Sequence, residues 1–92
     1  MEYAVNESIF VRKEKQGDED IYFIYVGDRD EMYKLNESSF DCFALIQNGL
    51  PFESVCNDLG KKYNKTSAEV IKETVQKTID NFISAGIIIA KN

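Results

Sequence analysis

The pattern of apolar residues changes from strand-like in the first half of the chain to helical in the second half. The densest run of β-branched and aromatic residues, Ile-Tyr-Phe-Ile-Tyr-Val at residues 21–26, predicts a strand. Shorter apolar or alternating runs predict two more strands, at residues 9–11 and at Glu31–Leu35. Turn-forming residues at 17–20 and 27–30 separate the three segments. Three strands joined by short turns predict an antiparallel meander.

The strand at Glu31–Leu35 runs directly into a helix, with no loop between them. Its residues alternate between two faces, with Tyr33 and Leu35 on the face that a half-buried strand turns inward. Asn36 offers a side-chain oxygen to the unpaired amides of the next turn, and Gly49 supplies the left-handed residue that ends many helices. If this strand lies at the edge of the sheet, it could bind a peptide as an added strand.

Two further amphipathic helices are predicted after Gly49. The first of them follows Pro51 and carries apolar residues at intervals of 3, 1, 3 and 4, namely Phe52, Val55, Cys56, Leu59 and Tyr63. The last helix covers about Ala68–Ala85, with Thr66 or Ser67 as its N-cap and Gly86 at its end. Residues 87–90 are predicted to form a short apolar tail or a strand. The sequence therefore predicts one α+β domain over residues 1–92, winged-helix-like, with a three-stranded antiparallel β-sheet followed by three α-helices.

The apolar stripe of the last helix covers more than half of the helix circumference. Its members are Val70, Ile71, Val75, Ile79, Phe82 and Ile83. One contact with a core needs a narrower stripe. Either part of the stripe lines a groove, together with Thr74 and Thr78, or the helix packs on two neighbours.

Composition narrows the classes of function. The chain contains no histidine, which is the commonest general base and metal ligand. It also lacks a C-x-x-C pair and both glycine-rich phosphate-binding motifs. Sixteen carboxylates are present, but no spacing singles out an acid/base pair. We therefore expect no enzyme activity, no metal site and no cofactor.

Neither end of the chain suggests export or a membrane. The N-terminal residues lack the basic and apolar regions of a signal peptide, and no segment approaches the roughly 20 apolar residues of a membrane span. Cys42 and Cys56 lie at apolar helical positions, where reduced, buried thiols are expected. These features predict a cytoplasmic protein.

With these residues laid out, the chain resembles the PqqD-like family, also called recognition elements for the precursors of ribosomally synthesised, modified peptides. The resemblance covers about residues 9–90. Its most specific part is the Leu-Asn pair at the strand–helix junction with glycine about one helix later. The residues that carry it are Tyr33, Leu35, Asn36, Phe43, Leu45, Ile46, Gly49, Phe52, Val55, Leu59, Tyr63, Val75, Ile79, Ile83, Gly86 and Ile87.

The resemblance implies a small, non-catalytic peptide chaperone. Such domains bind the leader of a precursor peptide and present it to a modifying enzyme, often a radical SAM enzyme. The leader adds as a strand to the third strand of the sheet, beside the third helix. Carried over to this chain, the peptide-binding residues are Glu31, Met32, Tyr33, Lys34, Leu35, Val70, Ile71, Thr74, Val75 and Thr78.

Two other classes of function fit a chain of this pattern. A winged-helix DNA-binding regulator would need a basic last helix, whereas this helix has Lys72 and Lys77 among three carboxylates, and the net charge of -5 argues against nucleic acid. A structural subunit could instead form a homodimer through the same strand edge. Two residues of that strand can each be interpreted in two ways. Lys34 either protects the edge from aggregation or pairs with an acidic leader residue. Leu35 belongs either to the core or to a peptide pocket.

Overall fold

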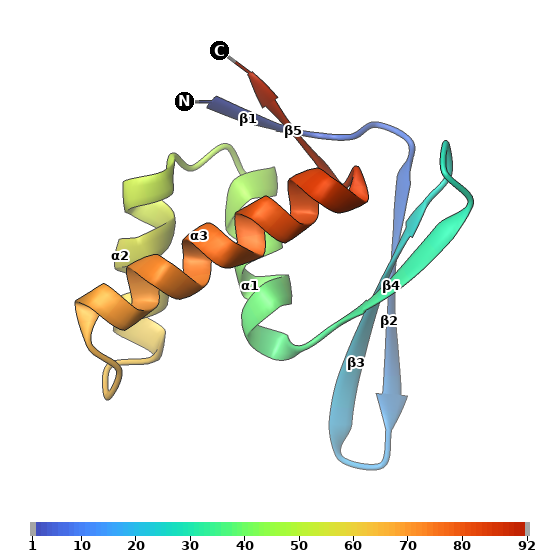
Figure 1. Cartoon of the computed structure of the whole chain (residues 1–92). Helices are drawn as coiled ribbons and strands as arrows, with labels where there is room; N and C mark the ends of the chain where they lie inside the picture. Colours follow the sequence, from blue (N-terminus) through green and yellow to red (C-terminus); the bar gives the residue numbers. More distant parts are fainter. Residues whose placement is uncertain (1, 92) are drawn as a thin grey trace.

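Three antiparallel strands followed by three helices confirm the predicted α+β architecture (Figure 1). The structure, a computed structural model, describes the backbone of residues 2–91 and the side chains of residues 3–90. The sheet has the order β2-β3-β4, so that β2 and β4 are its two edges. The elements of this unit are β2 (Ile9–Gln16), β3 (Glu19–Val26), β4 (Glu31–Leu35), α1 (Glu37–Gln47), α2 (Phe52–Lys62) and α3 (Ala68–Ala85).

The β2–β3 hairpin is longer than the sequence pattern predicts. Instead of stopping near residue 11, β2 continues through the charged residues to Gln16 and pairs there with Glu19. Only Gly17 and Asp18 remain for the turn, and Gly17 has the left-handed φ of 62° that such a short turn requires. The tip of the hairpin extends beyond the helices (Figure 1), so neither of its faces is buried and no apolar alternation marks it in the sequence.

A second, two-stranded sheet joins the ends of the chain. It pairs β1 (Glu2–Val5) with β5 (Ile88–Lys91), which settles residues 88–91 as a strand, whereas β1 was not predicted (Figure 1). The Asn6 backbone amide donates to the Ile87 carbonyl oxygen at 2.9 Å. The Asn6 side-chain amide donates to the Gly86 carbonyl oxygen at 2.8 Å. These bonds fix the end of α3 against the start of the chain.

The core lies between the inner face of the three-stranded sheet and the helices. Ile24 of β3 is fully buried, and Phe43 of α1 packs edge-on against Phe82 of α3 with ring centroids 6.2 Å apart. Cys42 is buried beside them, and this burial raises the pKa of its thiol to about 12. The thiol therefore stays protonated and behaves as a small apolar side chain, as predicted. No helix in the described part of the chain is long and apolar enough to cross a membrane.

The helix boundaries follow the signals in the sequence closely. The Asn36 side-chain oxygen accepts from the Ser39 backbone amide at 2.8 Å and so caps α1 one residue after β4 ends. Ser67, not Thr66, caps α3, and Gly86 ends that helix with a φ of 79°. Because Asn36 leaves no room for a loop, the direction of β4 is coupled to the position of α1.

Replacing Asn36 with alanine should lower the free energy of unfolding by about 1 kcal/mol, because the Ser39 amide loses its acceptor. Urea denaturation followed by far-UV circular dichroism measures this change. Asn36→Asp is the matched control and should stay close to wild type, since a carboxylate accepts the same bond. A stability of Asn36→Ala equal to wild type would show that the cap contributes nothing.

Candidate functional site

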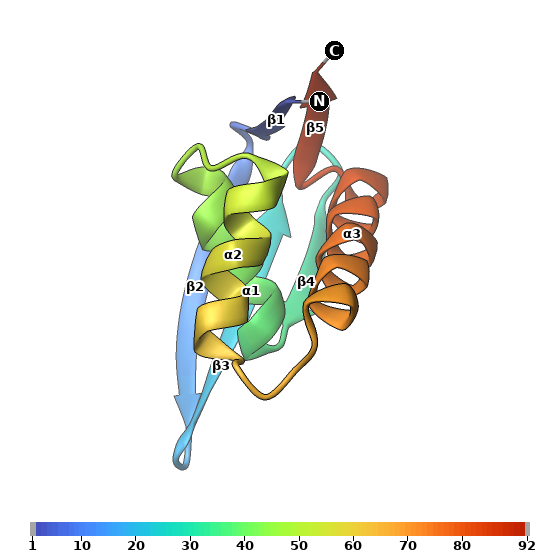
Figure 2. The same ribbon diagram turned by 90° about the vertical axis from the view of Figure 1, so that its left-hand side faces the viewer.

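The open edge of β4 faces α3 across a gap. β4 hydrogen-bonds only to β3, so its other edge presents backbone amides and carbonyls that no described strand pairs. Figures 1 and 2 together show the C-terminal half of α3 nearest to β4, yet no Cα atom of α3 comes within 8 Å of one in β4. Neighbouring strands in a sheet lie only about 4.8 Å apart. The gap therefore leaves space beside β4 for another extended backbone.

A groove of about 280 Å³ lies in this gap. Its residues come from β4, α1, α3 and the segment before β5, and they are Tyr33, Lys34, Leu35, Ser39, Thr78, Asn81, Phe82, Ala85 and Ile87. Phe82 and Ile87 are buried, and they give the groove an apolar floor. Tyr33, Ser39, Thr78 and Asn81 add polar groups. Apolar floors with a few polar groups are typical of sites that bind side chains of a ligand.

The register of the sheet decides which β4 side chains reach the groove. Leu35 pairs with Tyr22 and Tyr33 pairs with Ile24, so both lie on the face that α1 covers. Met32 and Lys34 lie on the opposite face, as the alternation predicts, although Lys34 also lines the groove from the strand edge. Leu35 packs against the core and also lines the groove, so both interpretations of this residue hold.

Tyr33 stands at the groove with its hydroxyl donating to the Glu31 carboxylate. This hydrogen bond raises the pKa of the Tyr33 hydroxyl above its ordinary value, and desolvation adds to the effect. The hydroxyl therefore remains protonated at neutral pH, and the ring is held along the strand by its partner two residues away.

The groove uses a different part of α3 from the part that the sequence indicates. Of the five α3 residues assigned to the site, only Thr78 lines it. Ile71 and Val75 are buried in the core, and Val70 and Thr74 are exposed outside the groove. A role of these four residues in peptide binding stays a prediction that the groove does not support.

The tilt of α3 explains this shift. Its N-terminal end lies beside α2, away from the sheet, and its C-terminal end approaches β4 (Figure 1). The lining therefore comes from the second half of the helix, through Asn81, Phe82 and Ala85, which sequence reasoning did not assign to the site. The broad apolar stripe did extend to this end, but the stripe carries no information on how the helix is inclined to the strand.

Arg29, in the β3–β4 turn, ties the end of α3 to the sheet. Its guanidinium donates to the Ser84 carbonyl oxygen at 2.7 Å, at the helix C-terminus where a cation is favoured. Its side chain also fills the space beside Gly86, where a Cβ atom would come within 2.7 Å of the Arg29 Nε atom. This contact fixes the separation of β4 and α3 at one end of the groove.

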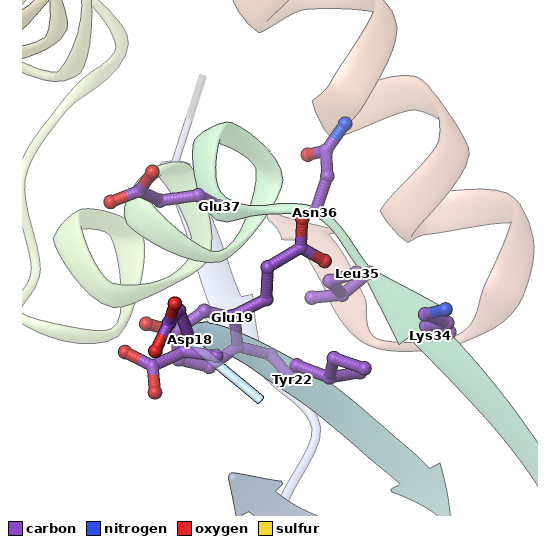
Figure 3. A pocket seen from close by; sticks show the side chains of 9 residues that line it. Asp18, Glu19, Tyr22, Lys34, Leu35, Asn36 and Glu37 are labelled. Carbon is purple, nitrogen blue, oxygen red and sulfur yellow. The ribbon is translucent and has the colours of Figure 1, made fainter. Parts of the chain in front are cut away.

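A larger cavity of about 480 Å³ lies at the other end of β4, between the hairpin tip and the start of α1. It shares Lys34 and Leu35 with the groove. Figure 3 shows Asp18, Glu19 and Glu37 on one side of this cavity and Lys34 on the other. Its lining is mostly charged, so despite its size it is the poorer place to hold an apolar side chain. Among residues 2–91, no group of His, Cys, Asp and Glu side chains is arranged to hold a metal ion.

Comparisons with known proteins identify a family and two structures of the same fold. The sequence profile of the family described as coenzyme PQQ synthesis protein D (PqqD) matches residues 22–88. Two solved structures share the fold. One is a lasso peptide synthetase B1 complexed with the leader peptide, with a TM-score of 0.83 and 14% identity over 98% of this chain and 100% of that one. The other is TbiB1 in complex with the TbiA(beta) leader peptide, with a TM-score of 0.80 and 8% identity over 100% of this chain and 99% of that one. No curated protein sequence matches the chain.

Replacing Arg29 with alanine should release the last turn of α3 from the β3–β4 turn. Losing a hydrogen bond from a charged donor at an exposed site should cost about 1 kcal/mol of stability. Backbone amides near Ser84 and Gly86 should then exchange hydrogen faster, as measured by mass spectrometry. Arg12→Ala is the control, because among the described residues the Arg12 side chain pairs only with Glu14 of its own strand. Equal exchange in both variants would show that Arg29 does not hold the helix.

Proposed function

The chain belongs to the PqqD family, and on this basis we propose that it is a non-catalytic chaperone for the leader of a ribosomally made precursor peptide. The leader adds as a fourth strand to the edge of β4 and lies in the groove beside the second half of α3. The observation that carries the proposal is the unpaired β4 edge standing next to an apolar groove of side-chain size. The two solved structures of the same fold are complexes with leader peptides, which supports this assignment.

The energetics require both the edge and the groove. A strand of about five residues forms about five backbone hydrogen bonds, each worth about 0.5–1.5 kcal/mol net. Ordering the same residues costs about 1–2 kcal/mol each. These two contributions roughly cancel, so affinity depends on apolar leader side chains, at about 1.5–3 kcal/mol for each one fully buried. Such side chains are buried against the floor of Phe82 and Ile87, with Leu35 and Ala85 beside it.

The groove also explains why binding would be selective. Because strand residues alternate, every second leader side chain points into the groove and the others point to the outer face of the sheet. Ser39, Thr78 and Asn81 place polar groups beside the floor. A leader side chain that points into the groove must therefore have an apolar end against the floor, and the part nearer its backbone must tolerate polar neighbours.

We further propose that the bound leader is handed to a peptide-modifying enzyme, with a radical SAM enzyme as the expected type. The domain itself supplies position and not chemistry. Holding the leader in a fixed register raises the effective concentration of the attached core peptide at the enzyme. A cytoplasmic location fits such a partnership.

The first test is binding of synthetic fragments of short precursor-like peptides encoded beside the gene for this chain. Calorimetry should show one peptide per chain for wild type, and Tyr33→Asp should abolish binding because it places a second carboxylate beside Glu31 at the groove. The control is Ile89→Asp, which adds the same charge at an exposed position of β5 outside the groove. Binding by the Tyr33 variant as tight as wild type would contradict the groove assignment.

A second test addresses strand addition itself. In a β-ladder, only every second residue of a strand directs its amide and carbonyl toward a given neighbour. N-methylation of successive leader residues should therefore weaken binding strongly at alternate positions and little between them. Calorimetry with the methylated peptides measures the pattern. A uniform effect, or none, would exclude pairing with β4.

The alternative of a homodimer through the same edge is tested by equilibrium sedimentation of the chain alone and with peptide. If the chain dimerises through β4, peptide should dissociate the dimer.

A further inference from the structure

The segment between β1 and β2 lies between the β3–β4 turn and the junction of α3 with β5, and Figure 1 shows it passing between these two parts of the chain. On the side of the turn, the Gly27 backbone amide donates to the Ser8 carbonyl oxygen at 2.8 Å. On the side of the helix, the Asn6 backbone amide donates to the Ile87 carbonyl oxygen at 2.9 Å. The segment is therefore bonded to both of its neighbours.

The Asn6 side chain joins the same two neighbours through a single amide group. Its Nδ2 atom lies 2.8 Å from the Gly86 carbonyl oxygen and 3.3 Å from each carboxylate oxygen of Asp28. A primary amide carries two hydrogens, so one can be donated to each partner. The Asn6 Oδ1 atom accepts from the Ser8 backbone amide at 2.9 Å, which fixes the orientation of the side chain. A carboxylate at this position could accept from Ser8 but could donate to neither of the other two partners.

The two partners of the Asn6 amide belong to the two walls of the groove. Asp28 lies in the turn that leads directly into β4, the wall with the open strand edge. Gly86 ends α3, which supplies the opposite wall, and the next residue is Ile87 of the groove floor. Asn6 therefore bridges the β4 wall and the α3 wall at one end of the groove, although its own side chain does not line the groove.

We propose that Asn6 is a positioning residue for leader binding, and that its amide bridge holds the two walls of the groove at the separation that an added strand needs. This inference rests on the proposed function, because it assumes that a leader lies between these walls. A leader strand must pair with β4 at about 4.8 Å and at the same time bury side chains against the floor beside α3. Walls that are held in place beforehand lower the entropy cost of meeting both requirements together.

The Asn6 bridge differs from the Arg29 contact at the same end of the groove. Arg29 reaches the Ser84 carbonyl oxygen, inside the last turn of α3. Asn6 reaches the two residues that follow that turn, Gly86 and Ile87. Asn6 also precedes residues 22–88, the part of the chain that matches the PqqD family, so the family match assigns it no role. The two links act on different residues of the α3–β5 junction, and neither replaces the other.

The leader affinity of Asn6→Asp tests the bridge. This substitution keeps the acceptor for Ser8 and removes both donated hydrogen bonds, so calorimetry should show leader binding about tenfold weaker than wild type. Asn57→Asp makes the same chemical change at an exposed position of α2 outside the groove, and it should bind as wild type does. Ser67→Ala removes the N-cap of α3 and so lowers stability, yet it should also bind as wild type does. Wild-type affinity of Asn6→Asp, or an equal loss in Ser67→Ala, would overturn the proposal.

A double-mutant cycle shows whether Asn6 and Asp28 act as one bridge. Asp28→Ala leaves the Gly86 bond in place and should weaken leader binding by a smaller factor, about threefold. It also carries the test if Asn6→Asp does not fold. The double variant Asn6→Asp/Asp28→Ala should bind no more weakly than Asn6→Asp alone, because the link between the two residues is already broken. Losses that add, or wild-type affinity of Asp28→Ala, would contradict a bridge.

The separation of the two walls can be measured without leader, by pulsed electron paramagnetic resonance. Spin-labelled amino acids at positions 32 and 77 report on it, because Met32 is exposed on β4 and Lys77 is exposed on α3. The distribution of label distances should be narrow in wild type and broader in Asn6→Asp, and an unchanged distribution would overturn the proposal even if leader binding weakens. If wild type binds no leader, the proposed function fails, while this measurement still tests the bridge. If wild type binds leader and Asn6→Asp matches it in both measurements, only the role of Asn6 fails.

Discussion

The separation between β4 and α3 is the constraint on which the rest of this structure depends. It is set from both sides of the gap. Phe43 of α1 packs edge-on against Phe82 and holds α3 in the core, while Arg29 fixes the end of α3 to the β3–β4 turn. Because α1 follows β4 immediately after Asn36, the strand cannot move toward the helix without displacing α1. The two elements are therefore held beside each other without closing on each other.

The fixed gap between β4 and α3 limits what can pair with the exposed edge of β4. An open edge is normally a risk, because its unpaired backbone groups can recruit other chains. Here the second half of α3 lies across the groove from the edge, so a segment that paired with β4 would place its side chains against the groove floor of Phe82 and Ile87. The same geometry that exposes the backbone of β4 thus also limits which side chains a paired segment could carry. Preorganisation of this kind lowers the entropy that a binding event must overcome.

Successive side chains of the five-residue strand β4 alternate between two faces of the sheet, the groove side and the outer side. Tyr33 and Leu35 face the groove side and Met32 faces the outer side, whereas Lys34 points to the outer side and also lines the groove from the strand edge. A peptide lying on this strand would share both surfaces, since its own residues alternate in the same way. A substitution at Met32 therefore alters the outer face alone, whereas substitutions at Tyr33 and Leu35 alter the groove.

The sequence by itself determined the local elements and their order. The cap at Asn36, the cap at Thr66 or Ser67 and the left-handed glycines at the helix ends act within a few residues, so they can be inferred from the local sequence, although only the structure selects Ser67 over Thr66. The alternation of β4 likewise gave the faces of its side chains. The full length of β2 could not be inferred, because both faces of the hairpin tip meet water and no apolar period records the strand. The β1–β5 pair was missed because it joins residues more than 80 positions apart.

Only the tertiary structure decided where the groove lies. Periodicity places Ile71, Val75 and Phe82 on one stripe of α3, but it does not show that the first two face the core and that Phe82 also reaches β4. That distinction depends on the tilt of α3, which results from its contacts with α2 at one end and with Arg29 at the other. Asn81 and Ala85 enter the site for the same reason. The period of a helix fixes which residues share a face, whereas the inclination of that face to a distant strand is fixed by packing between segments that the sequence keeps far apart.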